Sequence, residues 1–309
     1  MGVPEWSNGM ASKAIGLVPT KVRTLAPTPF KMIGYIVGFF ALLSIYNEIN
    51  FFLIKRRIVG PIKTMKGAES FSKKKGKKVA LLIHGFSSSP RELRELGDFL
   101  AKNNISVHAP LLPGHGTSPE RLAITKYFQW IESINDTIKK LEKEYSEIYL
   151  IGNSLGGNLA LISASKSKKI KGIVTLGTPM LYRKDKLKRY VLFPILKRIK
   201  LFQKKSYNRD MTEIAKRRVS YNVIPLKSIN HMLKIVSLSK KNLKEIKTPI
   251  LIMQTKNDAV TNEVSGKYIL DNISSKQKEL VTIPESYHVF ILDKYRKQAN
   301  KIILDFIQK

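Results

Sequence analysis

The chain has 309 residues, of which 43% are hydrophobic and 25% are charged, a balance typical of a globular protein and unlike that of a disordered one. It contains no cysteine, which excludes disulfides, thiolate catalysis, iron–sulfur clusters and cysteine-ligated zinc. Its 55 Lys and Arg against 23 Asp and Glu give a formal net charge of +32, which favours an anionic partner such as a membrane surface or a nucleic acid.

The positive charge is concentrated in two segments. Residues 1–78 hold 14 basic and 3 acidic side chains, and residues 181–247 hold 20 and 4. The remaining residues hold 21 basic side chains (55 less 34) and 16 acidic ones (23 less 7), a net charge of only +5. We therefore interpret the rest of the chain as a near-neutral domain that carries two basic segments.

The first of these segments contains a predicted membrane span. Residues 1–31 are expected to form a flexible leader, and residues 32–54 are mostly apolar and uncharged apart from Glu48 near their end. As a helix these 23 residues reach about 34 Å, enough to cross a hydrocarbon core of about 30 Å. A buried core helix and a cleaved signal peptide remain the alternatives.

Cationic residues on both sides of the span indicate its orientation. Four Lys and Arg precede it, whereas residues 55–78, predicted to be a basic linker, begin with Lys-Arg-Arg and end with KKKGKK. The side with more positive charge is usually cytoplasmic. The domain that follows is therefore expected to be anchored by a single pass and to lie in the cytoplasm.

Residues 79–309 alternate between strand patterns and helix patterns. The expected strands are 79–83, 105–109, 148–151, 172–176, 250–254 and 279–283, and the expected helices are 90–103, 125–145, 155–165 and 293–308. This alternation predicts an α/β domain with a doubly wound, mostly parallel sheet. In such a sheet the chemistry lies at the carboxyl ends of the strands.

One of these strand ends carries a nucleophile motif. Residues 152–157 read GNSLGG and fit G-x-S-x-G between a strand and a helix. Glycine is needed on both sides of the serine because side chains there would collide in so tight a turn. Ser154 would lie at the helix N-terminus, where backbone N–H groups stabilise developing negative charge. Ser154 is the predicted nucleophile.

A serine nucleophile needs a general base and an acid that orients it. If the base follows the nucleophile in the chain, only two histidines qualify. His231 lies in the second basic segment with no strand before it, whereas His288 follows the strand 279–283 by a short loop. Asp258 follows the strand 250–254 and is the expected acid. The competing carboxylates are Glu263, Asp271 and Glu285.

The strand 79–83 ends in His84-Gly85-Phe86, the usual place for an oxyanion-binding amide. The backbone N–H groups of Phe86 and Leu155 are therefore the predicted oxyanion hole. His84 is expected to hold the turn by hydrogen bonds, and His115, in the turn sequence PGHG, is expected to be structural.

Five motifs in this order resemble the α/β-hydrolase fold: HGF at 84–86, PGHG at 113–116, GNSLGG at 152–157, ND at 257–258 and YH at 287–288. Within that fold residues 79–309 are similar to small bacterial carboxylesterases related to monoacylglycerol lipases. The resemblance implies a triad of Ser154, Asp258 and His288, no metal or organic cofactor, and esters of medium or long acyl chains as substrates. Tyr287 replaces the glycine that relatives often carry, and it is expected to narrow the pocket or tilt the histidine loop.

The resemblance also implies that residues 181–247 form a cap over the site. Between positions 192 and 202 apolar residues recur at helical spacing among many lysines. This pattern predicts either binding to an anionic membrane surface or a cap helix packed on the core, and the two are compatible. Nucleic-acid binding is disfavoured because no recognition motif accompanies the charge.

The expected function is that of a membrane-anchored serine ester hydrolase. Lysophospholipase or acyltransferase activity on membrane lipids is the enzymatic alternative. An alternative of another class is a catalytically silent protein that binds the membrane surface.

Overall fold

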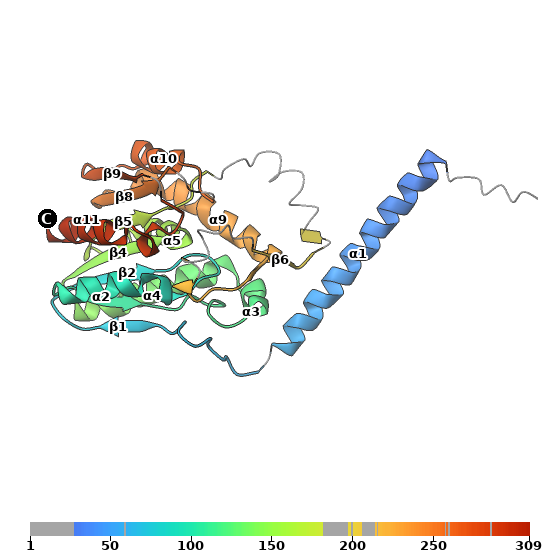
Figure 1. The fold of residues 1–309 in the computed structure, drawn as a ribbon, viewed down its shortest axis with the longest axis horizontal. Helices are drawn as coiled ribbons and strands as arrows, with labels where there is room; N and C mark the ends of the chain where they lie inside the picture. Colours follow the sequence, from blue (N-terminus) through green and yellow to red (C-terminus); the bar gives the residue numbers. More distant parts are fainter. Residues whose placement is uncertain are drawn as a thin grey trace, which may run out of the picture. The chain divides into compact units, whose positions relative to one another are not determined.

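The computed structural model describes residues 28–58, 60–181, 197–198, 200–205, 214, 216–256, 258, 260–284 and 286–309. The chain divides into two compact units, Met1–Leu42 and Leu43–Lys309. Helix α1, Pro29–Arg57, begins in the first unit and ends in the second. The second unit holds all the other described elements (Figure 1).

Helix α1 covers the predicted span 32–54. In the described part of the chain it is the one helix that is long and apolar enough to cross a membrane, a property that a signal sequence shares. Its 29 residues reach about 43 Å. Large apolar side chains from Phe30 to Leu53 are exposed along it, whereas Asn47 and Phe51 are buried.

The second unit is built on a seven-stranded sheet in the order β1-β3-β2-β4-β5-β8-β9. All neighbours are parallel except β1 and β3. The strands are β1 (Phe71–Lys73), β2 (Lys78–Ile83), β3 (Ser106–Ala109), β4 (Glu147–Asn153), β5 (Ile170–Leu176), β8 (Ile250–Thr255) and β9 (Lys278–Ile283). The prediction of a mostly parallel, doubly wound sheet is confirmed.

Strand β1 was not expected, because it lies within residues 55–78, which the sequence predicts to be a linker. It pairs antiparallel with β3, with Phe71 opposite Ala109. Phe71 is buried, but Lys73 and the lysines after it are not. A three-residue strand is too short for an alternating pattern to reveal it.

Helices cover both faces of the sheet, as a parallel sheet requires. Along β2, Val79, Leu81 and Ile83 pack on one side, while Ala80 and Leu82 pack on the other, because side chains alternate along a strand. The first face is covered by α4 (Tyr127–Glu144), α5 (Leu155–Ser163), α9 (Leu226–Asn242) and α10 (Val264–Asn272). The second face is covered by α2 (Arg94–Lys102) and α11 (Arg296–Gln308).

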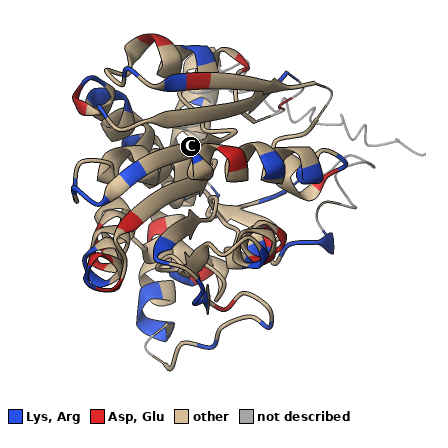
Figure 2. Ribbon diagram, turned by 90° about the vertical axis from the view of Figure 1, so that its left-hand side faces the viewer, with Lys and Arg blue, Asp and Glu red and all other residues tan. Residues whose placement is uncertain are grey.

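Short helical turns complete the unit: α3 (Pro119–Ile124), η1 (Pro90–Leu93), η3 (Leu243–Glu245) and η4 (Phe290–Leu292). Figure 2 shows that Lys and Arg lie mostly on helices and loops, whereas the strands are largely uncharged. The charge is thus kept out of the buried sheet, where ionised groups are costly.

The predicted cap lies between β5 and β8. Its described part contains β6 (Phe202–Lys204), which pairs antiparallel with β7 (Val223–Pro225), and then α9. Residues 182–196, 199, 206–213 and 215 lie outside the described residues, so most of the predicted amphipathic stretch does too. The described part of this predicted cap contacts the loop after β2, because Tyr221 N–H donates to the Ser87 carbonyl (3.2 Å) and Ser89 Oγ donates to the Val219 carbonyl (2.8 Å).

Candidate active site

Ser154 occupies a tight turn between β4 and α5. Its φ of 51° and ψ of −114° lie in a region that residues other than glycine rarely adopt. Its N–H donates to the carbonyl of Leu176 at the end of β5 (2.8 Å). The strained turn is thus held by the neighbouring strand, and the hydroxyl is partly accessible at the start of a helix.

The glycines around Ser154 are required by the closeness of the backbone. A Cβ on Gly156 would lie 2.0 Å from the carbonyl oxygen of Ile83 in β2. A Cβ on Gly152 would lie 2.2 Å from the Gly156 carbonyl. The turn therefore tolerates no side chain at either position, as the G-x-S-x-G motif predicts.

The structure brings together the three side chains predicted from the loops after β4, β8 and β9. His288 Nε2 lies 2.9 Å from Ser154 Oγ, and His288 Nδ1 lies 2.7 Å from Asp258 Oδ2. Asp258 is 1% exposed, and its Oδ1 accepts the N–H groups of Val260 and Thr261, both at 2.8 Å. These distances are those expected if Asp258 keeps a proton on Nδ1, so that Nε2 can accept from the Ser154 hydroxyl.

The other carboxylates and His231 lie elsewhere. Asp271 pairs with Lys267 on α10 (3.1 Å), and Glu263 precedes that helix. His231 stacks on Tyr127, with 6.1 Å between the ring centroids. Glu285 lies outside the described residues.

The two histidines expected to be structural are buried beside the loop after β2. His84 Nδ1 donates to the Gly85 carbonyl (2.9 Å), and its Nε2 accepts the N–H of Leu112 (3.1 Å). Burial lowers the pKa of His84, and burial together with His84 lowers the pKa of His115 well below its usual range. Both rings are therefore neutral at pH 7.

The two backbone amides predicted for the oxyanion have no protein acceptor among the described residues. Leu155 is the first residue of α5, where N–H groups lack an intrahelical partner. Phe86 lies in the loop after β2, which Gly156 approaches closely. One such donor in the turn of Ser154 and one in the neighbouring loop after β2 are what the predicted oxyanion hole requires.

Glu92 was not predicted from the sequence to belong to the site. It is 1% exposed, and it binds both the loop after β2 and the residue before Ser154. One oxygen accepts the Gly85 N–H (2.7 Å) and the side-chain amide of Asn153 (2.9 Å), and the other accepts the Ser88 hydroxyl (2.5 Å). Glu92 therefore ties the loop after β2 to the residue before Ser154. Only its position soon after the HGF motif could have drawn attention to it.

The loop that carries His288 is held from three sides. Gly177, after β5, has a φ of +54°, and a Cβ there would lie 3.1 Å from the His288 carbonyl oxygen. Thr255 Oγ1 donates to the Ser286 carbonyl (2.7 Å), and the Ser286 hydroxyl bonds to Asp293. Tyr287 is partly buried and packs against the core beneath the second face of the sheet.

The cap brings positive charge near the loop after β2. The N–H of Lys205 donates to the Asn222 carbonyl (2.9 Å), next to Tyr221, which bonds to Ser87. Burial and the neighbouring Arg218 lower the pKa of Lys205 to about 7, while the charge of Glu92 acts to raise it. Lys205 is thus a basic residue that interacts both with Arg218 and with the buried carboxylate of Glu92.

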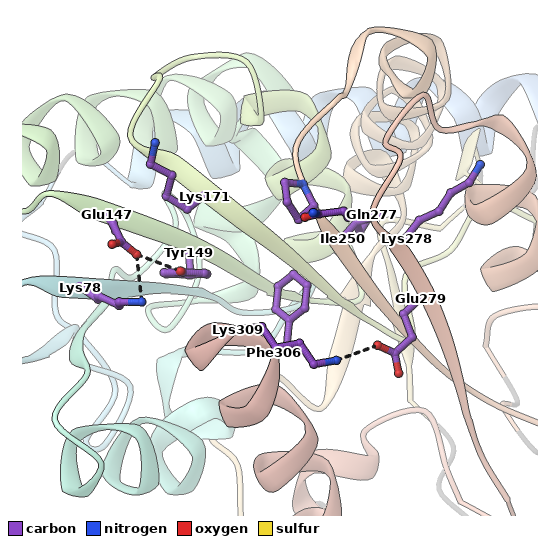
Figure 3. A pocket seen from close by; sticks show the side chains of 11 residues that line it. Lys78, Glu147, Tyr149, Lys171, Ile250, Gln277, Lys278, Glu279, Phe306 and Lys309 are labelled. Carbon is purple, nitrogen blue, oxygen red and sulfur yellow. Dashed lines mark hydrogen bonds and ion pairs between the residues drawn. The ribbon is translucent and has the colours of Figure 1, made fainter.

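A hollow of about 580 Å³ lies at the opposite end of the strands (Figure 3). It is lined by the first residues of β2, β4, β8 and β9 and by the end of α11. Lys78 pairs there with Glu147 (3.2 Å), and Lys309 pairs with Glu279 (3.7 Å). Because chemistry in parallel sheets lies at the carboxyl ends, this hollow is not the candidate active site.

Among the described residues, no three His, Asp or Glu side chains are grouped so that they could hold a metal ion.

Known proteins similar to this chain include esterases and lipases. A family described as "Serine aminopeptidase, S33" matches residues 74–295. A carboxylesterase of Bacillus subtilis (strain 168) is 28% identical over 240 residues, which cover 77% of this chain and 96% of the relative. A thermostable monoacylglycerol lipase of Bacillus sp. (strain H-257) is 28% identical over 253 residues, 79% and 96% of the two chains. A solved structure reported for two metagenome-derived lipolytic enzymes, LipS and LipT, has a TM-score of 0.72 and 25% identity, and covers 80% of this chain and 99% of that chain.

The contact between Gly156 and Ile83 predicts that Gly156→Ala is strongly destabilising. The methyl group would force β2 and α5 apart, and the free energy of unfolding should fall by about 3 kcal/mol. Gly60→Ala is the matched control, because its Cβ meets no atom within 4 Å. Urea denaturation of both variants in detergent measures the difference, and equal stability would contradict the steric argument.

The contacts of Glu92 predict that Glu92→Gln slows the reaction of Ser154 more than it weakens the fold. Loosening the loop after β2 moves the Phe86 amide, and sub-ångström displacements of such donors reduce rates by about tenfold. The rate of fluorophosphonate labelling of Ser154 is measured beside thermal stability, with the exposed Glu132→Gln as control. If Glu92→Gln were labelled as fast as the parent chain, Glu92 would only stabilise the fold and the prediction would be wrong.

Proposed function

The chain belongs to the serine aminopeptidase S33 family of hydrolases, and we propose that it cleaves carboxylic esters of lipids through an acyl-serine intermediate. The family match covers residues 74–295, and relatives over three quarters of the chain are a carboxylesterase and a monoacylglycerol lipase. The observation that carries the proposal is His288 lying within hydrogen-bond distance of both Ser154 and Asp258.

In the proposed first half-reaction, Ser154 Oγ attacks the ester carbonyl carbon while His288 Nε2 takes its proton. The carbonyl oxygen becomes an oxyanion and accepts hydrogen bonds from the Phe86 and Leu155 amides, each worth about 10²–10³ in rate. The C–O bond to the alcohol then breaks, and His288 gives its proton to the departing oxygen. Asp258 stabilises the imidazolium that exists between these transfers.

In the second half-reaction, water takes the place of the alcohol. His288 removes a proton from the water, the hydroxide oxygen adds to the acyl carbon, and the bond to Ser154 Oγ breaks as the serine regains its proton. The products are a carboxylic acid and the free enzyme. An alcohol in place of the water would give acyl transfer, so the two activities share every step up to this point.

Labelling with a fluorophosphonate tests the proposed nucleophile. The parent chain should form a covalent adduct at Ser154, and Ser154→Ala should form none while it keeps its thermal stability. Hydrolysis of p-nitrophenyl esters of rising chain length and of monoacylglycerol should follow the same pattern. An unlabelled parent would favour the catalytically silent binding protein, and cleavage of aminoacyl anilides in place of esters would favour a peptidase.

A second candidate activity is hydrolysis of lysophospholipids with an anionic headgroup. It is favoured by Lys205 and Arg218, which place positive charge in the cap beside the loop that holds the Phe86 amide. A neutral monoacylglycerol would make no use of these charges, whereas a phosphate would accept charge-assisted hydrogen bonds from them.

This second candidate predicts a pH dependence that the neutral substrate lacks. Because the pKa of Lys205 is lowered to about 7, its amine is charged below pH 7 and loses its proton above it. Between pH 6 and 8 the ratio of KM for lysophosphatidylglycerol to KM for monoacylglycerol should rise by about tenfold, the value of one charge-assisted hydrogen bond. Lys205→Gln should abolish the rise, and the exposed Lys204→Gln should keep it. A ratio that is constant with pH would refute the role of Lys205.

We also propose that α1 anchors the enzyme in a membrane with the hydrolase domain in the cytoplasm. The support is the apolar exposed surface of α1 and the basic residues that follow it. Removal of residues 1–42 should shift the protein from the carbonate-resistant membrane fraction to a fraction released by 0.5 M salt. A truncated protein that resists carbonate would show that α1 is not the anchor.

A further inference from the structure

We propose that a cationic cavity, which we call the α1–α9 cavity, binds the phosphate of an anionic membrane lipid as a non-catalytic ligand. The cavity is defined by Glu48, Phe51, Lys126, Arg198, Lys227 and His231, and its volume is about 440 Å³. Its residues come from the last third of α1, the start of α4, the cap and the first turns of α9. All of them lie within the unit Leu43–Lys309.

The cavity carries an excess of positive charge. Four of its lining residues are Lys or Arg, including Lys197, and one is a carboxylate, Glu48. Lys227 Nζ lies 2.7 Å from Glu48 Oε1 and 3.8 Å from the centre of the Phe51 ring, so this pair is neutralised and held in place. The remaining charge of Lys126 and Arg198 is available to attract an anion.

Helix α4 adds to this attraction. Lys126 is the residue that precedes the 18 residues of α4, so the positive end of the helix dipole lies at the cavity. His231 is held there by stacking on Tyr127, which is the first residue of α4. Neutral imidazole retains one N–H donor, and a phosphate has several acceptor oxygens. The cavity thus combines ammonium, guanidinium, ring N–H and helix-terminus groups, all of which suit a phosphate.

Contacts of α1 place the cavity at the level expected for lipid headgroups. Asn47 Nδ2 donates to the Arg198 carbonyl (3.1 Å), and Phe51 is buried beside Lys227. From Phe30 to Glu48 a helix rises about 27 Å, close to the thickness of the hydrocarbon core. If Phe30 marks one side of that core, Glu48 marks the other, where phosphates lie. A lipid, rather than free phosphate, is therefore the expected source of the anion.

The position of the cavity relates it to the active site. Lys227 and His231 belong to the first turns of α9, and only five residues lie between Lys227 and Tyr221, whose N–H donates to the Ser87 carbonyl in the loop after β2. A lipid phosphate bound in the cavity would hold this part of the cap against the membrane surface. Acyl substrates would then enter from the bilayer rather than from water.

The test measures lipid retained by the full chain carrying Ser154→Ala, so that no lipid is consumed and the result does not depend on ester hydrolysis. The protein in an uncharged detergent is titrated with phosphatidylglycerol, phosphatidylcholine or inorganic phosphate, and bound molecules are counted by native mass spectrometry. The test variant is Lys126→Gln with Arg198→Gln. The control is Lys166→Gln with Lys168→Gln, which removes the same charge from exposed positions outside the cavity.

We expect phosphatidylglycerol to bind in preference to phosphatidylcholine and to resist millimolar inorganic phosphate. The cavity variant should bind it about 25-fold more weakly, at about fivefold for each cation removed, and the control should bind it normally. Equal loss in the control would show that net charge alone is responsible and would overturn the proposal. Displacement by inorganic phosphate at equal concentration would overturn the lipid as the ligand.

Discussion

The site depends on one steric constraint, the close approach of the first turn of α5 to the end of β2. Because Gly156 carries no side chain, the backbone of α5 lies against the Ile83 carbonyl. This contact brings the start of α5, with Ser154 and the Leu155 amide, beside the loop that holds the Phe86 amide. The predicted nucleophile and the two predicted N–H donors are thereby placed together by backbone packing, which is more rigid than side-chain contacts alone.

Two buried carboxylates orient the groups around this turn, and neither is left unsatisfied. Asp258 accepts two backbone N–H groups with one oxygen and His288 with the other. Glu92 accepts a backbone N–H, a hydroxyl and a side-chain amide. Burying a carboxylate is tolerated only with such a full set of donors. The donors also limit the movement of each loop, so the cost of burial is offset by a more ordered site.

Most of the net positive charge of the chain lies in segments outside the strands and turns that form the site. Outside residues 1–78 and 181–247 the chain carries a net charge of only +5, while the basic residues concentrate in those two segments. Surface cations interact over about 10 Å at 0.1 M salt, which is enough to attract a membrane but too short to dominate a buried site. Lys205 is the exception, because the cap carries it close to Glu92.

The sequence by itself determined the parallel α/β sheet, the apolar helix and the three side chains placed after β4, β8 and β9, because periodicity and steric turn motifs are local properties. The tertiary structure alone decided which distant groups meet. Asn153 meets Glu92 across 61 residues, Asn47 meets the Arg198 carbonyl across 151, and Lys227 meets Glu48 across 179. Strand β1 likewise exists only because β3 offers it an edge. No local pattern in the sequence predicts these long-range contacts, because they depend on how the layers of the fold pack together.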